Sequence, residues 1–592
     1  MGAIAGILGA VPDQDGRLLE TIGRRAHLGI EQLEIPGGRF YHGISRRDSC
    51  HALKETCRGE IYDLIFNGNL YNERELSREL GLPAENIRTG KLLLACYLCW
   101  GQDCVRHFNG VFALAIYEEK QKRLFLARDP MGIKPLFYRT HGEKFLFGSE
   151  IKNILAFPGE KAVLTREGAM ELVMLGPGRM PGSGVYESIR ELKPGCFGIY
   201  HLGKLSLTQY WALEDREHKE SFSDTAEHVS WLIRDAVQRQ TGNLQNYGCL
   251  LSGGLDSSIL SALCREENRE AKFQTFSVDY QGNDRNFVPG KFQPDSDDAY
   301  IGIMQEFLNS NHKKTVLTPE DLVDHLEEAA MARDLPGLGD VDASLLVFAK
   351  AVKQQVPMVL SGECADEIFG GYPWFRDPEI RTQKGFPWAQ NTALRKELLL
   401  PGREEAEDFV RVLYEDSLKN CHILPSSSGE DRRIKELMHL NMVWFMQTLV
   451  DRNDRMSAAA GLDIRVPFCD IRIPQYLYGV PWKMKDHMGR EKGLLRHAVR
   501  DLLPEEVCMR KKSPYPKTFD PRYADMIRYK IRSLLLEDSP LWYVIRRQAV
   551  QAIFTEEPHT PFYGQLMKTP QIGAWLLQMD YLLRAHSVEL FF

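Results

Sequence analysis

The fold of this chain is decided by the stretch Cys249-Leu-Leu-Ser-Gly-Gly-Leu-Asp-Ser-Ser-Ile-Leu260. The apolar run Cys249–Leu251 is typical of the end of a buried strand, and Ile259–Cys264 carries apolar residues at helical spacing. Residues 252–258 are therefore predicted to form the loop of a strand–loop–helix turn, which is where α/β proteins bind phosphates.

The residue types in this loop suit a triphosphate with a bound cation. Gly253 and Gly254 have no Cβ, so the backbone can turn sharply and bring N–H groups close to an anion. Three hydroxyl donors accompany them: Ser252, Ser257 and Ser258. The carboxylate of Asp256 fits such a loop only if a divalent cation bridges it to the phosphates. The spacing is not that of a Walker loop, and a Gly-Gly pair alone more often marks a simple turn.

Length and composition narrow the class of protein. A chain of 592 residues is expected to hold two or three domains, and 43% hydrophobic with 26% charged residues is ordinary for a soluble globular protein. The net charge of −7 argues against nucleic acid as a partner, because phosphate contacts need clustered Lys and Arg. No apolar run approaches the roughly 20 residues of a membrane span, so no membrane contact is expected.

The amino terminus and the cysteines indicate a cytoplasmic location. Residues 1–10 lack the basic start of a signal peptide, and twelve scattered cysteines without an export signal predict free thiols in a reducing compartment. Cys96 and Cys99 have metal or redox spacing, but they lie in the helical-looking run Leu92–Trp100 without a partner Cys/His pair. Packed core thiols are the favoured interpretation.

Strand-like and helical runs alternate after a charged linker. Residues 212–223 include Glu214–Glu220 and are predicted to be a solvated connection between domains at 1–211 and 224–592. The second domain alternates strand runs at Gly248–Leu251, Thr275–Val278, Lys314–Leu317 and Met358–Leu360 with helical runs at Ala299–Phe307, Leu322–Met331 and Ala343–Val352. This pattern predicts a doubly wound parallel sheet with ligands at the carboxyl ends of its strands, followed by mostly helical additions from about Gly385.

A second candidate loop follows the strand Met358–Leu360 and reads Ser361-Gly-Glu-Cys-Ala-Asp-Glu-Ile-Phe-Gly-Gly-Tyr372. Its carboxylates Glu363, Asp366 and Glu367 repel one another unless a cation or a proton-transfer role accounts for them. Acidic capping of a helix is the equally weighted alternative.

The first 211 residues are rich in short strand-like runs separated by Gly, Asn and Pro turns: Ile61–Phe66, Val111–Tyr117, Leu124–Ala127 and Phe145–Phe147. Three of its stretches are Phe66-Asn-Gly-Asn-Leu-Tyr-Asn72, Phe108-Asn-Gly-Val-Phe-Ala113 and Leu126-Ala-Arg-Asp-Pro-Met-Gly-Ile-Lys-Pro-Leu136. They resemble the N-terminal glutaminase domain of the glutamine-dependent asparagine synthetases, a four-layered sandwich of the α+β class. The resemblance implies release of ammonia from glutamine.

The catalytic residues of that glutaminase domain are missing from this sequence. The family's nucleophile is a Cys directly after the initiator Met, but here the residue is Gly2, which cannot form an acyl-enzyme. The family's Asn-Gly-Glu is Asn67-Gly68-Asn69, its Ser-Asp-Thr-Glu corresponds to Arg88–Lys91, and its His-Arg-Gly-Pro-Asp is His27–Glu31. Arg47 of the pair Arg46–Arg47, which would bind the glutamine carboxylate, survives. We therefore expect a vestigial glutaminase pocket in a retained scaffold.

Both loops of the second domain resemble the synthetase domain of the same family. Ser252–Ser258 is similar to the pyrophosphate-binding loop of the N-type ATP pyrophosphatases, and Ser361–Glu367 to the asparagine synthetase motif Ser-Gly-Glu-Gly-Ala-Asp-Glu, with Cys364 in place of the commoner Gly. The resemblance implies that Asp256 and Asp366 bind Mg²⁺ and that Glu363 handles a proton of the nucleophile. It also implies an ATP site bordered by Leu250, Val278, Ser361 and Gly362.

A basic segment, Met509-Arg-Lys-Lys-Ser-Pro-Tyr-Pro-Lys517, is by default a solvated loop. The family's catalytic lysine aligns with Lys512, with Lys511 as the second choice, and such a cation can neutralise charge on a departing pyrophosphate. Asp454–Ser457, Gly461–Asp470 and Arg490–Arg496 resemble the helical part of the synthetase domain and are assigned to packing. The stretch after about Leu535 carries no motif that we recognise.

Together these features predict an amide synthetase that attacks Mg·ATP with a substrate carboxylate, giving an acyl-adenylate and pyrophosphate, and then passes the acyl group to an amine. The carboxylate would belong to a small molecule or a peptide, ammonia is the favoured amine, and a homodimer fits the interpretation. One alternative is a ligase or cyclase resembling the β-lactam synthetases or lasso-peptide cyclases. Another is a non-catalytic nucleotide-binding paralogue, against which the intact Asp256, Glu363, Asp366 and Lys512 count.

Overall fold

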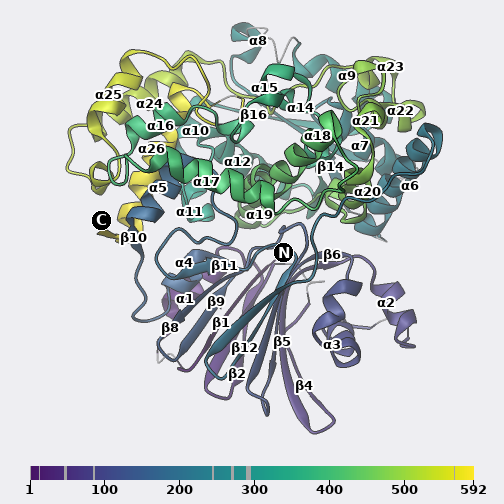
Figure 1. Ribbon diagram of the computed structural model, residues 1–592, viewed down its shortest axis with the longest axis vertical. Helices are drawn as coiled ribbons and strands as arrows, with labels where there is room; N and C mark the ends of the chain where they lie inside the picture. Colours follow the sequence, from purple (N-terminus) through teal and green to yellow (C-terminus); the bar gives the residue numbers. More distant parts are fainter. Residues whose placement is uncertain are drawn as a thin grey trace.

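The computed structural model describes residues 2–11, 14–45, 50–83, 87–242, 244, 246–267, 273–287, 295–565 and 567–592. Two antiparallel sheets form the lower part of the molecule in Figure 1, and a parallel sheet surrounded by helices forms the upper part. The mixed α/β class predicted from the sequence is therefore confirmed, with antiparallel sheets preceding a parallel one.

Each N-terminal sheet has six strands. The first has the order β11-β8-β9-β1-β3-β2 and the second β13-β12-β7-β6-β5-β4. The strands of the first sheet are β1 (Gly2–Leu8), β2 (Gly29–Ile35), β3 (Gly38–Ile44), β8 (Phe137–His141), β9 (Lys144–Gly148) and β11 (Ile189–Glu191). Those of the second are β4 (Leu53–Cys57), β5 (Glu60–Leu70), β6 (Gly110–Glu118), β7 (Arg123–Arg128), β12 (Cys196–His201) and β13 (Lys204–Gln209).

The two sheets pack through alternating apolar side chains, among them Phe40 and Phe147 from the first sheet and Ile65 from the second. Helices α1 (Gly16–Gly23) and α4 (Ile151–Leu155) lie against the first sheet, and α2 (Glu73–Glu79) and α3 (Thr89–Trp100) beside the second (Figure 1). This is the four-layered arrangement that the resemblance implied, and all four strand runs expected from the sequence fall inside observed strands.

The parallel sheet has the order β16-β15-β14-β17-β18. Its strands are β14 (Gly248–Leu250), β15 (Gln274–Tyr280), β16 (Asn311–Leu317), β17 (Met358–Leu360) and β18 (Asp463–Arg465). The first four were expected. Assigning Gly461–Asp470 to helical packing was wrong, because β18 pairs in parallel with β17 and extends the sheet after a long helical excursion.

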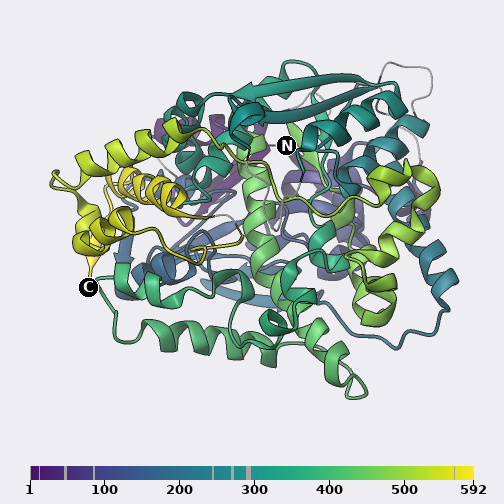
Figure 2. The same cartoon turned by 90° about the horizontal axis from the view of Figure 1, so that it is seen from above.

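Helices surround this sheet and extend beyond it, as Figure 2 shows. Next to the strands and along the excursion they are α6 (Phe222–Thr241), α7 (Leu255–Glu267), α8 (Asn283–Asn286), α9 (Asp297–Leu308), α10 (Pro319–Asp324), α11 (Leu326–Arg333), α12 (Asp340–Lys353), α13 (Ala365–Phe369), α14 (Pro373–Arg376), α15 (Pro378–Thr382), α16 (Thr392–Leu398), α17 (Ala406–Lys419), α18 (Gly429–Leu440) and α19 (Met446–Ala460). After β18 they are α20 (Arg472–Gly479), α21 (Trp482–Lys485), α22 (Gly493–Ala498), α23 (Glu505–Cys508), α24 (Pro521–Leu534), α25 (Arg547–Thr555) and α26 (Thr569–Ala585). Helix α5 (Arg166–Leu175) and the parallel pair of β10 (Val163–Thr165) with β19 (Glu589–Phe591) complete the set.

Helix α19 runs through the middle of the molecule (Figure 2). A π-helical turn at Asn441–Phe445 joins it without a break to α18. The fully buried carboxylate of Asp454 on α19 pairs with Arg25 at 2.6 Å and Lys134 at 2.7 Å, both from the N-terminal part. The two halves of the molecule are therefore connected through buried charges.

The linker is mostly exposed but anchored at one residue. Four of the seven residues in Glu214–Glu220 are exposed, as expected for a solvated connection. Asp215 differs, because it is buried and pairs with Lys435 at 2.7 Å, and its other carboxylate oxygen accepts from the backbone N–H of Leu424. A buried carboxylate requires such partners, so the linker is held against α18 at this point.

The cysteines also differ in one respect from the expectation of free thiols. Cys364 and Cys469 form a disulfide with a Cα–Cα distance of 6.0 Å. The other ten cysteines are free; Cys96 is buried in α3 and Cys99 is exposed. Within the described ranges no cluster of His, Cys, Asp or Glu forms a site for a metal by itself.

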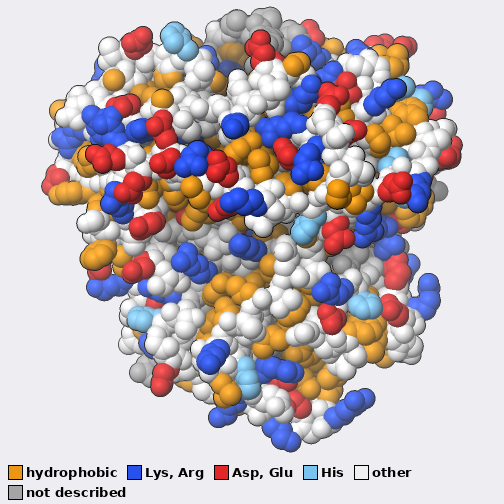
Figure 3. Space-filling model, in the orientation of Figure 1, with side chains coloured by type: hydrophobic (Ala, Val, Ile, Leu, Met, Phe, Trp, Pro, Cys, Tyr) orange, Lys and Arg blue, Asp and Glu red, His pale blue; other side chains and the backbone are white. Residues whose placement is uncertain are grey.

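The sequence predicts neither a nucleic-acid partner nor a membrane span. On the face shown in Figure 3, acidic and basic side chains are interspersed and do not separate into one large basic area. Over the part of the chain that the structure describes, every helix is too short or too polar to cross a bilayer.

Replacing Asp454 by Asn should destabilise the protein strongly. Burial alone would raise the pKa of Asp454, but Arg25 and Lys134 outweigh it and hold the pKa well below its ordinary value. Asn would leave Lys134 buried without a counter-charge and Arg25 with Glu150 alone, and breaking a buried ion pair in this way commonly costs about 3–5 kcal/mol in the free energy of unfolding. Because the folded pKa is depressed, the contribution of Asp454 is present above about pH 4 and is lost as the pH falls further.

Urea denaturation of the wild type and of Asp454→Asn at neutral pH measures this loss of stability. The matched control is Asp525→Asn, which removes an exposed partner of Arg528 and should change the unfolding midpoint little. Equal midpoints for Asp454→Asn and the wild type would show that the buried pairs do not contribute.

Candidate active site

A cavity of about 320 Å³ opens at the carboxyl ends of β14, β15 and β17. Its walls come from both loops predicted from the sequence, from the basic segment Met509–Lys517 and from the C-terminal segment around Tyr563–Gln571. A volume of this size suits a small-molecule ligand. The site therefore lies where parallel sheets place their ligands.

The two loops touch through glycine. Gly253 has φ +68°, and a Cβ there would lie 2.8 Å from the backbone N of Ile301, so the turn requires glycine. A Cβ on Gly362 would lie 2.9 Å from Cβ of Asp256. The hydroxyls of Ser252 and Ser257 lie 3.1 Å apart beside this contact. The close approach brings Asp256 and Asp366 to the same point.

A buried lysine bridges these carboxylates. Nζ of Lys492 lies 2.5 Å from Oδ2 of Asp256 and 2.6 Å from Oδ1 of Asp366, while Nζ of Lys512 lies 3.3 Å from Oδ2 of Asp366. Lys492 has a left-handed backbone, φ +55°, at the start of α22. A non-glycine residue in this conformation is held there by its surroundings and is typical of functional sites.

Burial and the nearby lysines shift the pKa values of the carboxyl groups in the cavity in opposite directions. Burial would raise the pKa of Asp366, but Lys492 and Lys512 outweigh it and lower the pKa to about 2. For Asp256, burial dominates and the pKa is raised, although Lys492 opposes it. Burial, with repulsion from Asp366, raises the pKa of Glu367 to about 7. Asp366 is thus the carboxylate most firmly held as an anion.

Glu363 also lines the cavity. One of its oxygens pairs with Nη2 of Arg452 from α19, and its buried Oε2 has no hydrogen-bond partner. The Arg452 guanidinium lies 5.3 Å from the ring centre of Tyr515. Glu363 is therefore oriented by an arginine and keeps one oxygen available as a proton acceptor.

Most of the predicted site residues line this cavity: Leu250, Ser252, Gly254, Asp256, Ser257, Val278, Ser361, Gly362, Glu363, Asp366, Lys511 and Lys512. Two differ. The side chain of Ser258 is fully buried inside α7, and Gly253 shapes the turn without lining the cavity.

Among the cavity residues that were not assigned to the site from the sequence are Lys492, Arg452 and Arg510. Lys492 had been placed in a packing segment, Arg510 was noted only as part of a basic run, and Arg452 had not been singled out. Arg510 donates to the carbonyl of Ser252 at 3.1 Å and lies 4.2 Å from the ring centre of Tyr300. A usable signal existed for Lys492, because Arg490–Arg496 carries four charges in seven residues, too many for a buried packing helix.

The described residues of the predicted glutaminase pocket lie on β1 and β5, which are inner strands of the two N-terminal sheets. The backbone N–H of Gly2, in β1, donates to Oδ1 of Asn67 at 3.0 Å. A Cβ on Gly2 would lie 2.2 Å from the carbonyl oxygen of Gly43, and one on Gly68 would lie 2.0 Å from that of Val111. Asn69 accepts from Arg465 of β18 at 3.2 Å. Arg47 lies outside the described residues.

Comparisons with known proteins agree with this geometry. Residues 228–584 match the family model described as asparagine synthase. The chain belongs to the asparagine synthase family. Residues 53–211 match the model of a glutamine amidotransferase domain. The protein is therefore a carbon–nitrogen ligase, an ATP-dependent amide synthetase of the asparagine-synthetase type.

Individual relatives cover nearly the whole chain. Asparagine synthetase [glutamine-hydrolyzing] 3 of Bacillus subtilis is 42% identical over 95% of this chain and 92% of its own length. Asparagine synthetase [glutamine-hydrolyzing] 1 of the same organism is 27% identical over 83% of this chain and 82% of its own. A solved glutamine phosphoribosylpyrophosphate amidotransferase from B. subtilis covers 53% of this chain and 81% of its own at 12% identity, with a TM-score of 0.28, too low to support an argument.

Replacing Lys492 by Met should move the acid limb of ATP turnover to higher pH. Without this ammonium, burial and Asp256 act on Asp366 against Lys512 alone, so the pKa of Asp366 rises from about 2. A neighbouring opposite charge commonly accounts for about 1–3 pKa units. The variant should therefore lose activity on acidification before the wild type does.

The pH dependence of pyrophosphate release at saturating ATP measures this shift. Lys485→Met is the matched control, because Lys485 is also buried but contacts the sulfur of Met438 and does not line the cavity. Superimposable profiles for Lys492→Met and the wild type would contradict the assigned role.

Proposed function

We propose that this asparagine synthase family member adenylates a substrate carboxylate with Mg·ATP and transfers it to a free amine, with ammonia favoured, and that it does not use glutamine. The proposal of adenylation rests on the convergence of Asp256, Asp366 and two lysines between the phosphate loop and Glu363. The proposal that glutamine is not used is supported by Gly2 and the residues around it.

The residues present fit a divalent cation bound together with ATP. Oδ1 of Asp256 is buried without a hydrogen-bond partner, and the carboxylate of Asp366 faces the same point. Oxygen ligands from one or two carboxylates, completed by phosphates, are what Mg²⁺ takes in such enzymes. When bound, the cation would neutralise charge on the phosphates.

The protein's own cations favour departure of pyrophosphate. Lys492, Lys512 and Arg510 lie along the rim of the phosphate loop, and negative charge that develops on the leaving group would meet them. Lys512 is poised by its contact with Asp366 and by the ring of Tyr372, 5.1 Å from Nζ. The ring is fixed by its hydroxyl, which donates to Glu367 at 2.6 Å.

Glu363 supplies the group that the second step needs. An amine attacking the acyl-adenylate must lose a proton, and the unpartnered Oε2 of Glu363 can accept it. Arg452 fixes the other oxygen, so the carboxylate cannot rotate away. The carboxylate substrate would then lie between this pair and the α-phosphate.

The N-terminal part lacks an activated nucleophile among the described residues. Gly2 has no side chain, and its Cα faces the Gly43 carbonyl. Cys50 is the first cysteine, but burial, with a smaller effect of Glu73 and Glu31, raises the pKa of its thiol to about 12. The two Bacillus subtilis relatives are named as glutamine-hydrolysing enzymes, and that name describes those proteins.

We expect no release of glutamate when the purified protein is incubated with glutamine, with or without Mg·ATP and a carboxylate. Gly2→Cys should not restore it, since the new Cβ would meet the Gly43 carbonyl at 2.2 Å and Asn69 replaces a substrate-binding carboxylate. Glutamate detected by a coupled dehydrogenase assay in either protein would contradict the proposal.

Mg·ATP, aspartate and ammonium should give AMP, pyrophosphate and asparagine, separated by chromatography. Asp256→Asn and Asp366→Asn should abolish pyrophosphate release, and Lys512→Ala should slow it by about 10²–10³. AMP without asparagine would identify another amine as the acceptor. No turnover of aspartate would mean that another carboxylate is the substrate, and full activity in all three variants would place the site elsewhere.

A further inference from the structure

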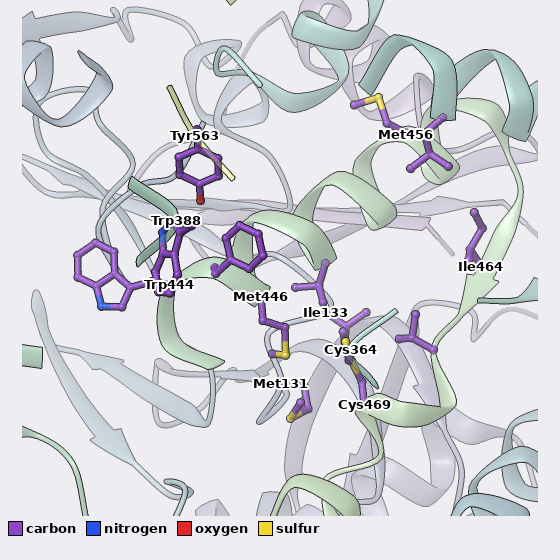
Figure 4. Close-up of a cluster of buried hydrophobic side chains, with 14 of the residues drawn as sticks. Met131, Ile133, Cys364, Trp388, Trp444, Met446, Met456, Ile464, Cys469 and Tyr563 are labelled. Carbon is purple, nitrogen blue, oxygen red and sulfur yellow. A yellow bond between two sulfur atoms is a disulfide. The ribbon is translucent and has the colours of Figure 1, made fainter. Parts of the chain in front are cut away.

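The disulfide between Cys364 and Cys469 lies inside the catalytic loop. Cys364 directly follows Glu363 and precedes Asp366 by two residues, and it lines the cavity. Cys469 belongs to the short helix Pro467–Cys469 that follows β18. Figure 4 shows the bond among apolar side chains that include Ile133 and Met131 of the N-terminal part.

The backbone of Cys364 is left-handed, with φ +79°. A residue with a Cβ avoids this region, and only glycine adopts it freely. The bond to Cys469 therefore holds residue 364 in a conformation that it would otherwise leave.

The loop on either side has no room to absorb a change at residue 364. A Cβ on Gly362 would lie 2.9 Å from Cβ of Asp256, and one on Gly371 would lie 1.9 Å from Oδ1 of Asp366. A rotation about Cys364 is therefore passed on to its neighbours Glu363 and Asp366, because Gly362 is packed against Asp256 and Gly371 against the carboxylate of Asp366.

The other end of the bond is anchored. The backbone N–H of Cys469 donates to the carbonyl of Val466 at 2.9 Å. The next residue, Asp470, is buried and accepts from Arg472 at 2.7 Å and from Asn109 at 3.2 Å. The disulfide thus ties the catalytic loop to a fixed wall of the sheet.

We propose that Cys364 and Cys469 form a reversible thiol–disulfide switch that sets the geometry of the adenylation loop, with the disulfide as the more active state. The inference rests on the proposed function, since the loop is the one that carries Glu363 and Asp366. Reduction frees residue 364 to move toward negative φ and displaces both carboxylates.

The exchange balances with a small-molecule disulfide as oxidant. Its S–S bond breaks and its two sulfurs leave as thiols, while the two protein thiols lose two protons and two electrons and join as Sγ–Sγ. A dithiol reverses the step. Because both cysteines are buried and only Cys364 faces the cavity, the reagent must enter through the ATP site.

The test compares protein equilibrated with glutathione disulfide and protein reduced with dithiothreitol, each freed of reagent. Pyrophosphate release should be about fivefold or more slower after reduction, as expected for loss of a restrained left-handed residue. Cys469→Ser should behave as the reduced wild type and no longer respond. Cys104→Ser, a buried thiol of the N-terminal part, is the control and should keep the response.

Cys364→Gly separates the bond from the backbone conformation. It should also lose the response, but its rate should exceed that of Cys469→Ser, because glycine adopts φ +79° without a side-chain penalty. A Cys364→Gly rate equal to or below that of Cys469→Ser would overturn the backbone explanation. Wild-type rates that differ by less than twofold between the two states would overturn the switch.

Thiol status is measured independently of turnover. Alkylation followed by peptide mass mapping should find Cys364 and Cys469 protected in the oxidised sample and modified in the reduced one, and Mg·ATP should slow their reduction. Modification of both in the oxidised sample, or no protection by Mg·ATP, would overturn the proposal. If neither state turns over aspartate, the proposed function fails. The switch is then tested by measuring the affinity for Mg·ATP of the oxidised and the reduced protein, and equal affinities would overturn it.

Discussion

The geometry of the candidate active site depends on one ammonium group held between two carboxylates. Asp256 and Asp366 come from loops more than a hundred residues apart, and their mutual repulsion at the edge of the sheet would separate the loops. Lys492 offsets this repulsion from a buried position, so the loops can approach through Gly362. The phosphate loop, the catalytic loop and the segment before α22 thus form one unit only because their charges balance.

Further buried ion pairs on α19 connect the candidate site to the N-terminal sheets. Arg452 orients Glu363 on one side of this helix, and Asp454 holds Arg25 and Lys134 on another. Buried charges are costly unless they are paired, so neither half can shift without exposing or unpairing some of them. The N-terminal sheets are thus held to the synthetase part by buried charges, whatever chemistry they perform.

The sequence predicted well those features that depend on short-range pattern. The strands β14 to β17 and the two ligand loops follow from apolar runs and glycine placement, and the match of Ser361–Glu367 to a family motif located Asp366. Strand β18 could not be predicted, because three residues carry little periodicity and their partner β17 is about a hundred residues away. Arg452 was missed because a buried charge is recognised mainly by the partners that folding brings to it, whereas for Lys492 the charge density of Arg490–Arg496 was a signal that we did not use. The docking of Asp215 and the bond between Cys364 and Cys469 likewise depend on distant partners.

The π-helical turn at Asn441–Phe445 has a consequence for how the site is encoded. A π turn holds one residue more than an α turn, and each residue of a helix advances it by about 100°. The turn therefore sets the phase of α19 relative to α18, which is packed against the linker through Lys435. Deleting a single residue there would convert the turn to regular α-helix and rotate the whole of α19 by about 100° relative to α18, so that Arg452 and Asp454 would both turn away from their present partners. Part of the geometry of the candidate site is thus stored as a residue count inside a helix, in a turn whose last residue, Phe445, itself lines the cavity.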